Sequence, residues 1–254
     1  MPEHDGHRER LRRRFLKTGL DSFEPHEILE LLLTYVIPRR DTNPIAHALL
    51  NKFGTLDKVF DATASDLMAV DGIGESAALF LRLLPEVFRQ YSISHQDTEN
   101  PKISLTNSIA VCKFMIPYFV GLNVEVCYLI ALDNNAAPIR VENIATGTVS
   151  AVTPYFRNIV DKLLVCNASG AILCHNHPSG NAAPSKNDIG FTVDLDYLLE
   201  STDIPLLDHI IIGSHDYYSF AENHIIGPER EDIDPDKINL KPRPLPAASG
   251  KQIT

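Results

Sequence analysis

The sequence is poor in cysteine, and the cysteines that it has are widely spaced. Its 254 residues include four, no two of which form a CxxC pair, and each lies inside an apolar segment. We therefore expect buried, reduced thiols rather than disulfides. The four residues are Cys112, Cys127, Cys166 and Cys174.

Long apolar runs are also absent. No stretch reaches the roughly 18 consecutive apolar residues that a membrane-spanning helix needs. The first residues, MPEHDGHRERLRRRF, are charged and lack the apolar core of a secretory signal. These two absences predict a cytoplasmic protein that has no association with a membrane.

Positive charge is scarce as well. The chain has 23 Lys and Arg against 33 Asp and Glu, which gives a formal net charge of −10. A general nucleic-acid-binding protein is therefore disfavoured, because such proteins normally carry a surplus of positive charge. The hydrophobic share of 44% and the charged share of 22% are those of an ordinary globular protein, and this length can bury a core without disulfides or structural metals.

Charge and proline usage divide the chain into four parts. Residues 1–91 predict a helical domain, and residues 104–227 alternate strand and helix signals. Between them, residues 92–103 are polar, lack periodicity and predict a linker. Residues 228–254 hold five of the 17 prolines and predict a disordered tail.

Apolar periodicity and turn residues place the individual elements. In the helical domain we expect helices over Glu27–Val36, stopped by Pro38, and from Asn43 to Gly54. In the second part, the expected strands are Val124–Asp133, Ile139–Ile144, Ala171–His175 and Asp208–Gly213, and the expected helices begin at Pro154 and Ser185. This order predicts an α/β (α+β) sandwich in which helices flank a mixed sheet, preceded by a small all-α domain.

The stretch HNHPSGNAAPSKND, residues 175–188, carries the clearest chemical pattern. His175 and His177 lie two positions apart where a buried strand ends, so their side chains point to the same side and can reach one ion. After a tight loop, Asp188 adds a carboxylate in the first turn of the next helix. Two imidazoles and one carboxylate leave a fourth tetrahedral position for water, the pattern of a catalytic zinc site.

Each part of this pattern also has a purely structural explanation. Ser185 and Asp188 have the spacing of a capping box, which needs no metal. A single His-x-His is common on exposed loops, and Cys174 faces the core rather than the histidines. The combination favours the metal site, and Ser185 can cap the helix while its hydroxyl is directed at that site.

The motif resembles that of a known family. His-x-His, seven residues, Ser, two residues and Asp resemble the JAMM motif of MPN-domain zinc metalloproteases. The sequences HNHPSG and PSxxD, followed by DHIIIG at 208–213, resemble those of the RadC family in particular. This resemblance covers about residues 7–227. The resemblance implies an MPN/JAMM-type sandwich and one Zn²⁺ per chain, held by His175, His177 and Asp188.

The resemblance also implies a glutamate that activates water and a serine that stabilises the oxyanion. The matching residues are Glu125, at the start of an expected strand, and Ser185. RadC-like chains often carry a glutamate in a His-Pro-Arg-Glu stretch, but here residues 153–156 read Thr-Pro-Tyr-Phe, which favours Glu125. The structural alternative is a solvated glutamate at a strand edge. Asp208 and His209 either orient the ligands or form a buried structural pair.

A second motif, at residues 67–81, resembles a helix-hairpin-helix. Gly72 and Gly74 permit a tight hairpin, and amides exposed at the next helix start could hold a DNA phosphate. Asp71 and Glu75 flank that position and would repel a phosphate, so a hairpin kept only for packing is equally consistent.

A basic run near the N-terminus offers further phosphate contacts. The alternative is a solvated helix face, which the i,i+4 spacing of Glu9 and Arg13 favours. The run comprises Arg8, Arg10, Arg12, Arg13, Arg14 and Lys17.

Two hypotheses of function follow. The first is a JAMM-type zinc metallopeptidase or isopeptidase, a hydrolase that acts on an unidentified peptide or protein; that the bond is an amide rests on the resemblance alone. The second is a DNA-associated repair or recombination accessory protein that binds DNA through residues 1–91 and has a structural or vestigial metal site. The two hypotheses can also be combined, in which case the helical domain delivers the peptidase to DNA-bound proteins.

Overall fold

The structure, a computed structural model, describes residues 3–99, 103–147, 156–227 and 238–246. The chain divides into two units, Met1–Tyr91 and Ser92–Thr254. Among the described residues, no helix combines the length and the apolar character that crossing a membrane requires. All four cysteines are free, and three of them are buried, as expected.

The first unit is all helical. Its elements are α1 (Glu3–Thr18), α2 (Pro25–Leu33), α3 (Asn43–Phe53), α4 (Leu56–Asp61), α5 (Ala64–Met68) and the first part of α6 (Glu75–Glu99). Leu29, Leu49 and Leu81, from α2, α3 and α6, are fully buried in its core. The prediction for α3 is confirmed: Pro44 lies in its first turn, and Gly54 ends it with a φ of 92°.

Helix α2 ends earlier than predicted, at Leu33 instead of Val36. Thr34 is the C-cap residue, and its hydroxyl donates to the Leu31 carbonyl. The backbone amides of Val36 and Ile37 still donate to the Leu33 carbonyl, and the Arg8 side chain donates to the carbonyls of Ile37, Pro38 and Arg40. Local backbone bonds and a distant cation thus hold the turn that follows the helix together.

Helix α6 is longer than predicted, because residues 92–99, expected to begin a linker, are helical. The segment contains neither glycine nor proline, so nothing in it breaks a helix that is already formed. The side chain of Gln96 also donates to the Phe114 carbonyl, at 3.2 Å.

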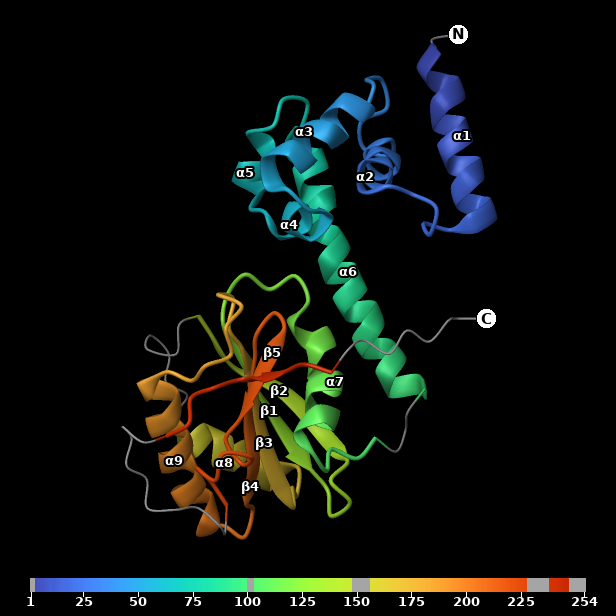
Figure 1. Ribbon diagram of the computed structural model, residues 1–254. Helices are drawn as coiled ribbons and strands as arrows, with labels where there is room; N and C mark the ends of the chain where they lie inside the picture. Colours follow the sequence, from blue (N-terminus) through green and yellow to red (C-terminus); the bar gives the residue numbers. More distant parts are fainter. Residues whose placement is uncertain (1–2, 100–102, 148–155, 228–237, 247–254) are drawn as a thin grey trace. The chain divides into compact units, whose positions relative to one another are not determined.

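The second unit contains a six-stranded sheet in the order β2-β1-β3-β4-β5-β6. The strands are β1 (Val126–Leu132), β2 (Pro138–Thr146), β3 (Gly170–Asn176), β4 (Leu206–Ile212), β5 (Asp216–Ser219) and β6 (Arg243–Pro244). Only β3 and β4 pair in parallel, so the sheet is mixed, as predicted. Helix α7 (Ser108–Phe119) covers one face, and α8 (Phe156–Val165) and α9 (Lys186–Glu200) cover the other (Figure 1). The predicted helix start at Pro154 lies outside the described residues.

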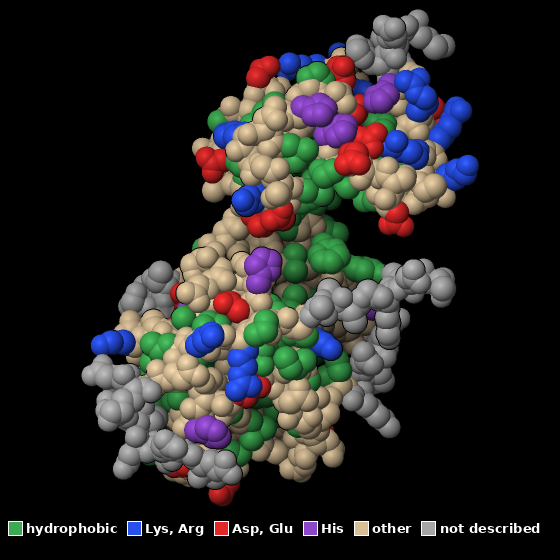
Figure 2. Space-filling model, viewed as in Figure 1, with side chains coloured by type: hydrophobic (Ala, Val, Ile, Leu, Met, Phe, Trp, Pro, Cys, Tyr) green, Lys and Arg blue, Asp and Glu red, His purple; other side chains and the backbone are tan. Residues whose placement is uncertain are grey.

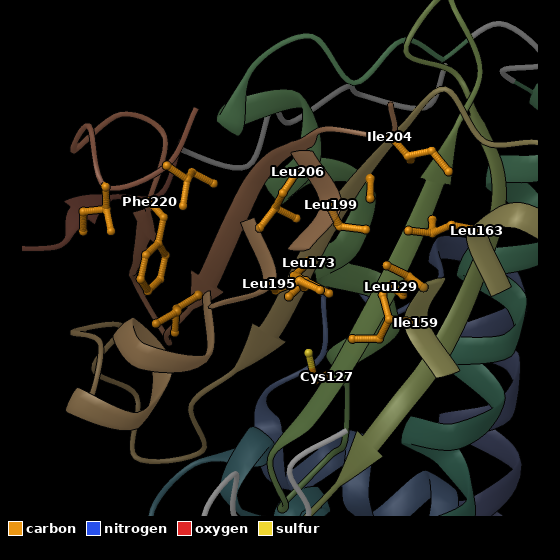
Figure 3. Close-up of a cluster of buried hydrophobic side chains, with 14 of the residues drawn as sticks. Cys127, Leu129, Ile159, Leu163, Leu173, Leu195, Leu199, Ile204, Leu206 and Phe220 are labelled. Carbon is orange, nitrogen blue, oxygen red and sulfur yellow. The ribbon is translucent and has the colours of Figure 1, made fainter. Parts of the chain in front are cut away.

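Alternating side chains of the strands build a separate core on each face. On the face of α8 and α9, Leu129 and Leu173 from neighbouring strands meet Leu163 and Leu195 from the two helices (Figure 3). On the face of α7, Ile130 and its neighbours pack against that helix. Helix α9 connects the two parallel strands, so its first turn begins close to the end of β3.

The tail contributes to the sheet, so the prediction of disorder over 228–254 was wrong for residues 238–246. Arg243 pairs with Tyr217 in the β5–β6 ladder, and the hydroxyl of Tyr218 donates to the Asn239 carbonyl at 2.8 Å. Ile238 and Leu245 pack against the two cores. The prediction missed this because the strand is created by pairing with β5 and has only two residues.

Candidate metal centre

The end of β3 carries the two predicted histidine ligands. His175 and Asn176 are its last residues, and His177 follows directly. The Nε2 atoms of His175 and His177 lie 3.0 Å apart, so both rings are directed at one point. The side chain of His175 is 1% exposed and that of His177 is 15% exposed, which makes the point accessible from one side only.

The orientation of His177 is set by the loop that follows it. Its Nδ1 lies 2.9 Å from the carbonyl oxygen of Asn181. A carbonyl oxygen only accepts hydrogen bonds, so Nδ1 carries the proton and the lone pair of Nε2 faces His175. The backbone amide of His177 donates to the Ile212 carbonyl, which ties this loop to the end of β4.

Asp188 reaches the same point from the first turn of α9. Its Oδ1 lies 3.6 Å from Nε2 of His175, and its Oδ2 lies 3.7 Å from Nε2 of His177. The capping box is also present: the Ser185 amide donates to Oδ2, and the Asp188 amide donates to the Ser185 hydroxyl oxygen. The capping box is therefore compatible with the predicted metal site, and it holds the carboxylate in place.

Glu125 stands immediately before β1 and faces the histidines. Its Oε1 lies 3.8 Å from Nε2 of His175. Asn176 holds the backbone on both sides of it, because its side chain accepts from the Val126 amide and donates to the Val124 carbonyl. Sequence reasoning missed Asn176, although it is the middle residue of the His-Asn-His motif and has to point away from the histidines.

Together the four residues form a group suited to a metal ion. Ligand atoms of Glu125, His175, His177 and Asp188 all lie within 4.8 Å of one another. Burial lowers the pKa of His175 to about 4, Asp188 opposes this shift, and His177 adds to it. The ring is thus neutral near pH 7, the form that binds metals. Two imidazoles beside two carboxylates fit a divalent transition-metal ion such as zinc.

A second group of potential ligands shares His175 but suits a metal less well. It consists of Cys127, His175 and His209, all buried. Burial raises the pKa of the Cys127 thiol, and the nearby Asp188 and Glu125 raise it further, so the metal-binding thiolate is disfavoured. The other neighbouring cysteine, Cys174, lies in the opposite core, as expected.

The neighbouring pair Asp208 and His209 is split between the two faces of the sheet. Nε2 of His209 lies 2.8 Å from Nδ1 of His175, so His209 contacts a predicted ligand. Asp208 instead accepts from the hydroxyls of Ser108 and Ser219 on the side of α7. His209 thus contacts a predicted ligand, whereas Asp208 is hydrogen-bonded within the opposite core. The other position at which RadC-like chains carry a glutamate corresponds to residues 153–156, and residues 153–155 lie outside the described part of the chain.

In the first unit, the helix-hairpin-helix motif is built around close packing. At Gly72, with a φ of +91°, a Cβ atom would come within 2.7 Å of the Ile45 side chain, whereas Gly74 has open space. Asp71 is 98% exposed and lies 3.6 Å from Arg40. Its exposed carboxylate adjoins Gly72 and would repel a phosphate at this hairpin.

Three of the six residues of the basic run of α1 contact other parts of the first unit. Arg8 holds the turn after α2, Arg12 lies over the ring of Tyr35, and Arg14 pairs with Glu27. The guanidinium of Arg14 also stacks on Phe23 at 4.0 Å. Figure 2 shows Lys and Arg gathered on the α1 side of this unit with acidic and histidine side chains among them. Arg10, Arg13 and Lys17 remain exposed, and Arg13 pairs with Glu9 at i,i+4, so the other half of the run is the expected solvated face.

The sheet, the helix order and the histidine-aspartate cluster define a JAB-type domain. The model of the RadC-like JAB domain matches residues 105–225, and that of the UPF0758 N-terminal domain matches residues 3–79. A UPF0758 protein of Fusobacterium nucleatum subsp. nucleatum is 38% identical over 228 residues, which cover 88% of this chain and 98% of that protein. The chain belongs to the UPF0758 family, with a RadC-like JAB domain in its second unit.

Proposed function

We propose that the second unit is a zinc-dependent hydrolase of the JAMM type, a peptidase or isopeptidase that cleaves an amide bond. The observation that supports this most is the convergence of Glu125, His175, His177 and Asp188 within 4.8 Å at the end of a buried strand. The JAB domain agrees with it, because this family includes hydrolases.

In this proposal His175, His177 and Asp188 would hold one Zn²⁺. When bound, zinc supplies Lewis acidity, which makes a water molecule acidic enough to attack a carbonyl carbon near neutral pH. The three ligands come from β3 and α9, which the parallel pairing of β3 with β4 keeps together.

Glu125 is the proposed general base. Its carboxylate lies beside the cluster on a strand end that is fixed by Asn176, and it is not needed to complete the ligand set. It takes a proton from the attacking water and then donates this proton to the leaving nitrogen. One carboxylate can perform both steps because the two protonation states are used in sequence.

Ser185 is the proposed oxyanion donor. Its oxygen accepts the Asp188 amide, at 3.2 Å, which uses a lone pair and leaves the hydroxyl proton available. That proton can be donated to the negative oxygen that forms when the carbonyl is attacked. The cap therefore positions Ser185 without consuming its donor.

The first test separates metal binding from catalysis. Elemental analysis should find one zinc per chain in the purified protein and none in His175→Ala or Asp188→Ala, with folding checked by circular dichroism. Glu125→Gln should keep the zinc but lower hydrolysis of peptide and isopeptide-linked libraries at least about 100-fold, because an amide cannot accept the proton.

Glu222→Gln is the matched control, since Glu222 contacts Tyr217 and Arg243 rather than the cluster. It should hydrolyse the same libraries as the unaltered chain does. Full activity of Glu125→Gln would disprove the choice of base. Failure of the unaltered chain to take up zinc, even after reconstitution, would disprove the metal hydrolase.

A further inference from the structure

Nδ1 of His175 contacts an unusual partner for a predicted metal ligand. His177 donates from Nδ1 to a backbone carbonyl, which can only accept. His175 faces Nε2 of His209 instead, at 2.8 Å, and an imidazole nitrogen can either donate or accept. The contact alone therefore leaves two proton arrangements, and only one of them leaves Nε2 of His175 free for a metal.

A threonine of α9 selects between these arrangements. The hydroxyl oxygen of Thr192 lies 2.5 Å from the carbonyl oxygen of Asp188 and 2.5 Å from Nδ1 of His209. Two oxygens this close repel unless a proton lies between them, and the carbonyl has none to give. The Thr192 hydroxyl therefore donates to Asp188 and must accept a hydrogen bond from His209.

The direction of this hydrogen bond then fixes the proton positions on the rings of His209 and His175. If Nδ1 of His209 carries the single proton of a neutral imidazole, its Nε2 has a lone pair and accepts from Nδ1 of His175. The lone pair at Nε2 of His175 then faces Nε2 of His177, 3.0 Å away, so a shared proton or a metal ion has to lie between the two nitrogens. In the reverse direction, a proton would occupy Nε2 of His175 and block the metal.

We infer that Thr192 and His209 are positioning residues, which hold His175 in the tautomer whose Nε2 can bind the metal. The side chains of His175, His209 and Thr192 form a buried hydrogen-bond network, so water does not compete for its hydrogen bonds. It begins at one proposed ligand, His175, and ends at the backbone of another, Asp188. His209 is further fixed by stacking on Phe220, with ring centroids 4.8 Å apart.

The inference rests on His175 being a ligand in the proposed function, and it is tested on the full chain by two readouts. Thr192→Val keeps the shape of the side chain but removes the hydroxyl, and Thr192→Ser keeps the hydroxyl. Zinc affinity, measured by competition with a chelator, should fall about 10- to 100-fold in the valine variant and stay within about threefold in the serine variant. Circular dichroism and thermal unfolding confirm that both variants fold.

The second readout does not involve a metal. Long-range ¹⁵N–¹H spectra of the metal-free chain distinguish the two imidazole tautomers, and His175 should be protonated at Nδ1 in the unaltered and serine proteins but lose this preference in Thr192→Val. His209→Gln should retain zinc better than His209→Phe, because an amide can accept from His175 and donate to Thr192.

The two readouts separate this inference from the proposed function. Equal zinc affinity in Thr192→Val and the unaltered chain, equal losses in both Thr192 variants, or an unchanged tautomer in the valine variant would each overturn it. If the unaltered chain binds no zinc, the proposed function is disproved. The tautomer of His175 in the metal-free chain still tests whether Thr192 sets the direction of the hydrogen bonds through His209.

Discussion

Asp208 is a residue whose burial should be visible in the pH dependence of stability. Its carboxyl group accepts from two serine hydroxyls and the Ala221 amide, yet burial outweighs these bonds and raises its pKa to about 6. Because the folded value lies above the ordinary 3.8, the unfolded chain loses this proton first as the pH rises. The contribution of protonated Asp208 to the free energy of unfolding is therefore complete below about pH 4 and is lost as the pH rises to about 6.

Asp208→Asn should remove this dependence, because its side chain stays neutral. The free energy of unfolding of the variant relative to the unaltered chain should rise by up to about 3 kcal/mol between pH 4 and pH 7. Urea unfolding at several pH values measures it, and contributions from His175 and His209 cancel in the difference. Parallel curves for the two proteins would show that Asp208 titrates as an exposed group.

Asn176 allows a second prediction at this scale. Asn176→Ala leaves the buried Val126 amide without its acceptor, which costs about 1–3 kcal/mol of stability. Zinc uptake should persist, since no ligand is lost, but Glu125 loses the contacts that frame it. Asn181→Ala is the control, because that side chain only accepts from the exposed Ala183 amide. A loss of stability as small as that of Asn181→Ala would contradict the prediction.

Among the elements, β6 shows how much the tail contributes. The reference is a chain that lacks residues 247–254, which lie outside the described part. Removal of residues 238–254 also takes away Ile238, Leu245 and the strand that pairs with β5, and should cost about 2 kcal/mol or more. Differential scanning calorimetry of the two truncated chains measures this, and equal midpoints would mean that the β5–β6 pairing adds no stability.

Elements with local signals were the ones that the sequence predicted well. Helix α9 begins after Ser185 and ends before Ser201, as expected, because its capping box is encoded within a single turn. The strand β6 depends on its pairing with β5, which is distant in sequence, and it was missed.

The same distinction applies to the site. His175, His177 and Asp188 lie in one short motif that predicted them together, and the structure groups their side chains. The contact of His175 with His209 follows from the parallel pairing of β3 and β4, which the sequence does not specify. Thr192 has no local mark, because a threonine in a helix commonly bonds back to its own helix.

For the molecule as a whole, charge argues against duplex DNA as the partner of the first unit. Residues 1–91 carry 12 basic and 14 acidic groups, and Arg8, Arg12 and Arg14 are engaged within the unit. We expect no measurable binding of the full chain to fluorescently labelled duplex DNA at about 0.15 M salt in anisotropy titrations. Tight binding that weakens steeply with added salt would restore the DNA-associated alternative.

The order of the ligands along the chain has a consequence for how the protein matures. His175, His177 and Asp188 belong to one short stretch, so an ion that joins them closes a small loop at little entropic cost. Glu125 joins the cluster only after β1 has paired with β3. Under the proposed function, an ion can therefore be captured by these three residues before β1 pairs with β3, and Glu125 joins the cluster afterwards.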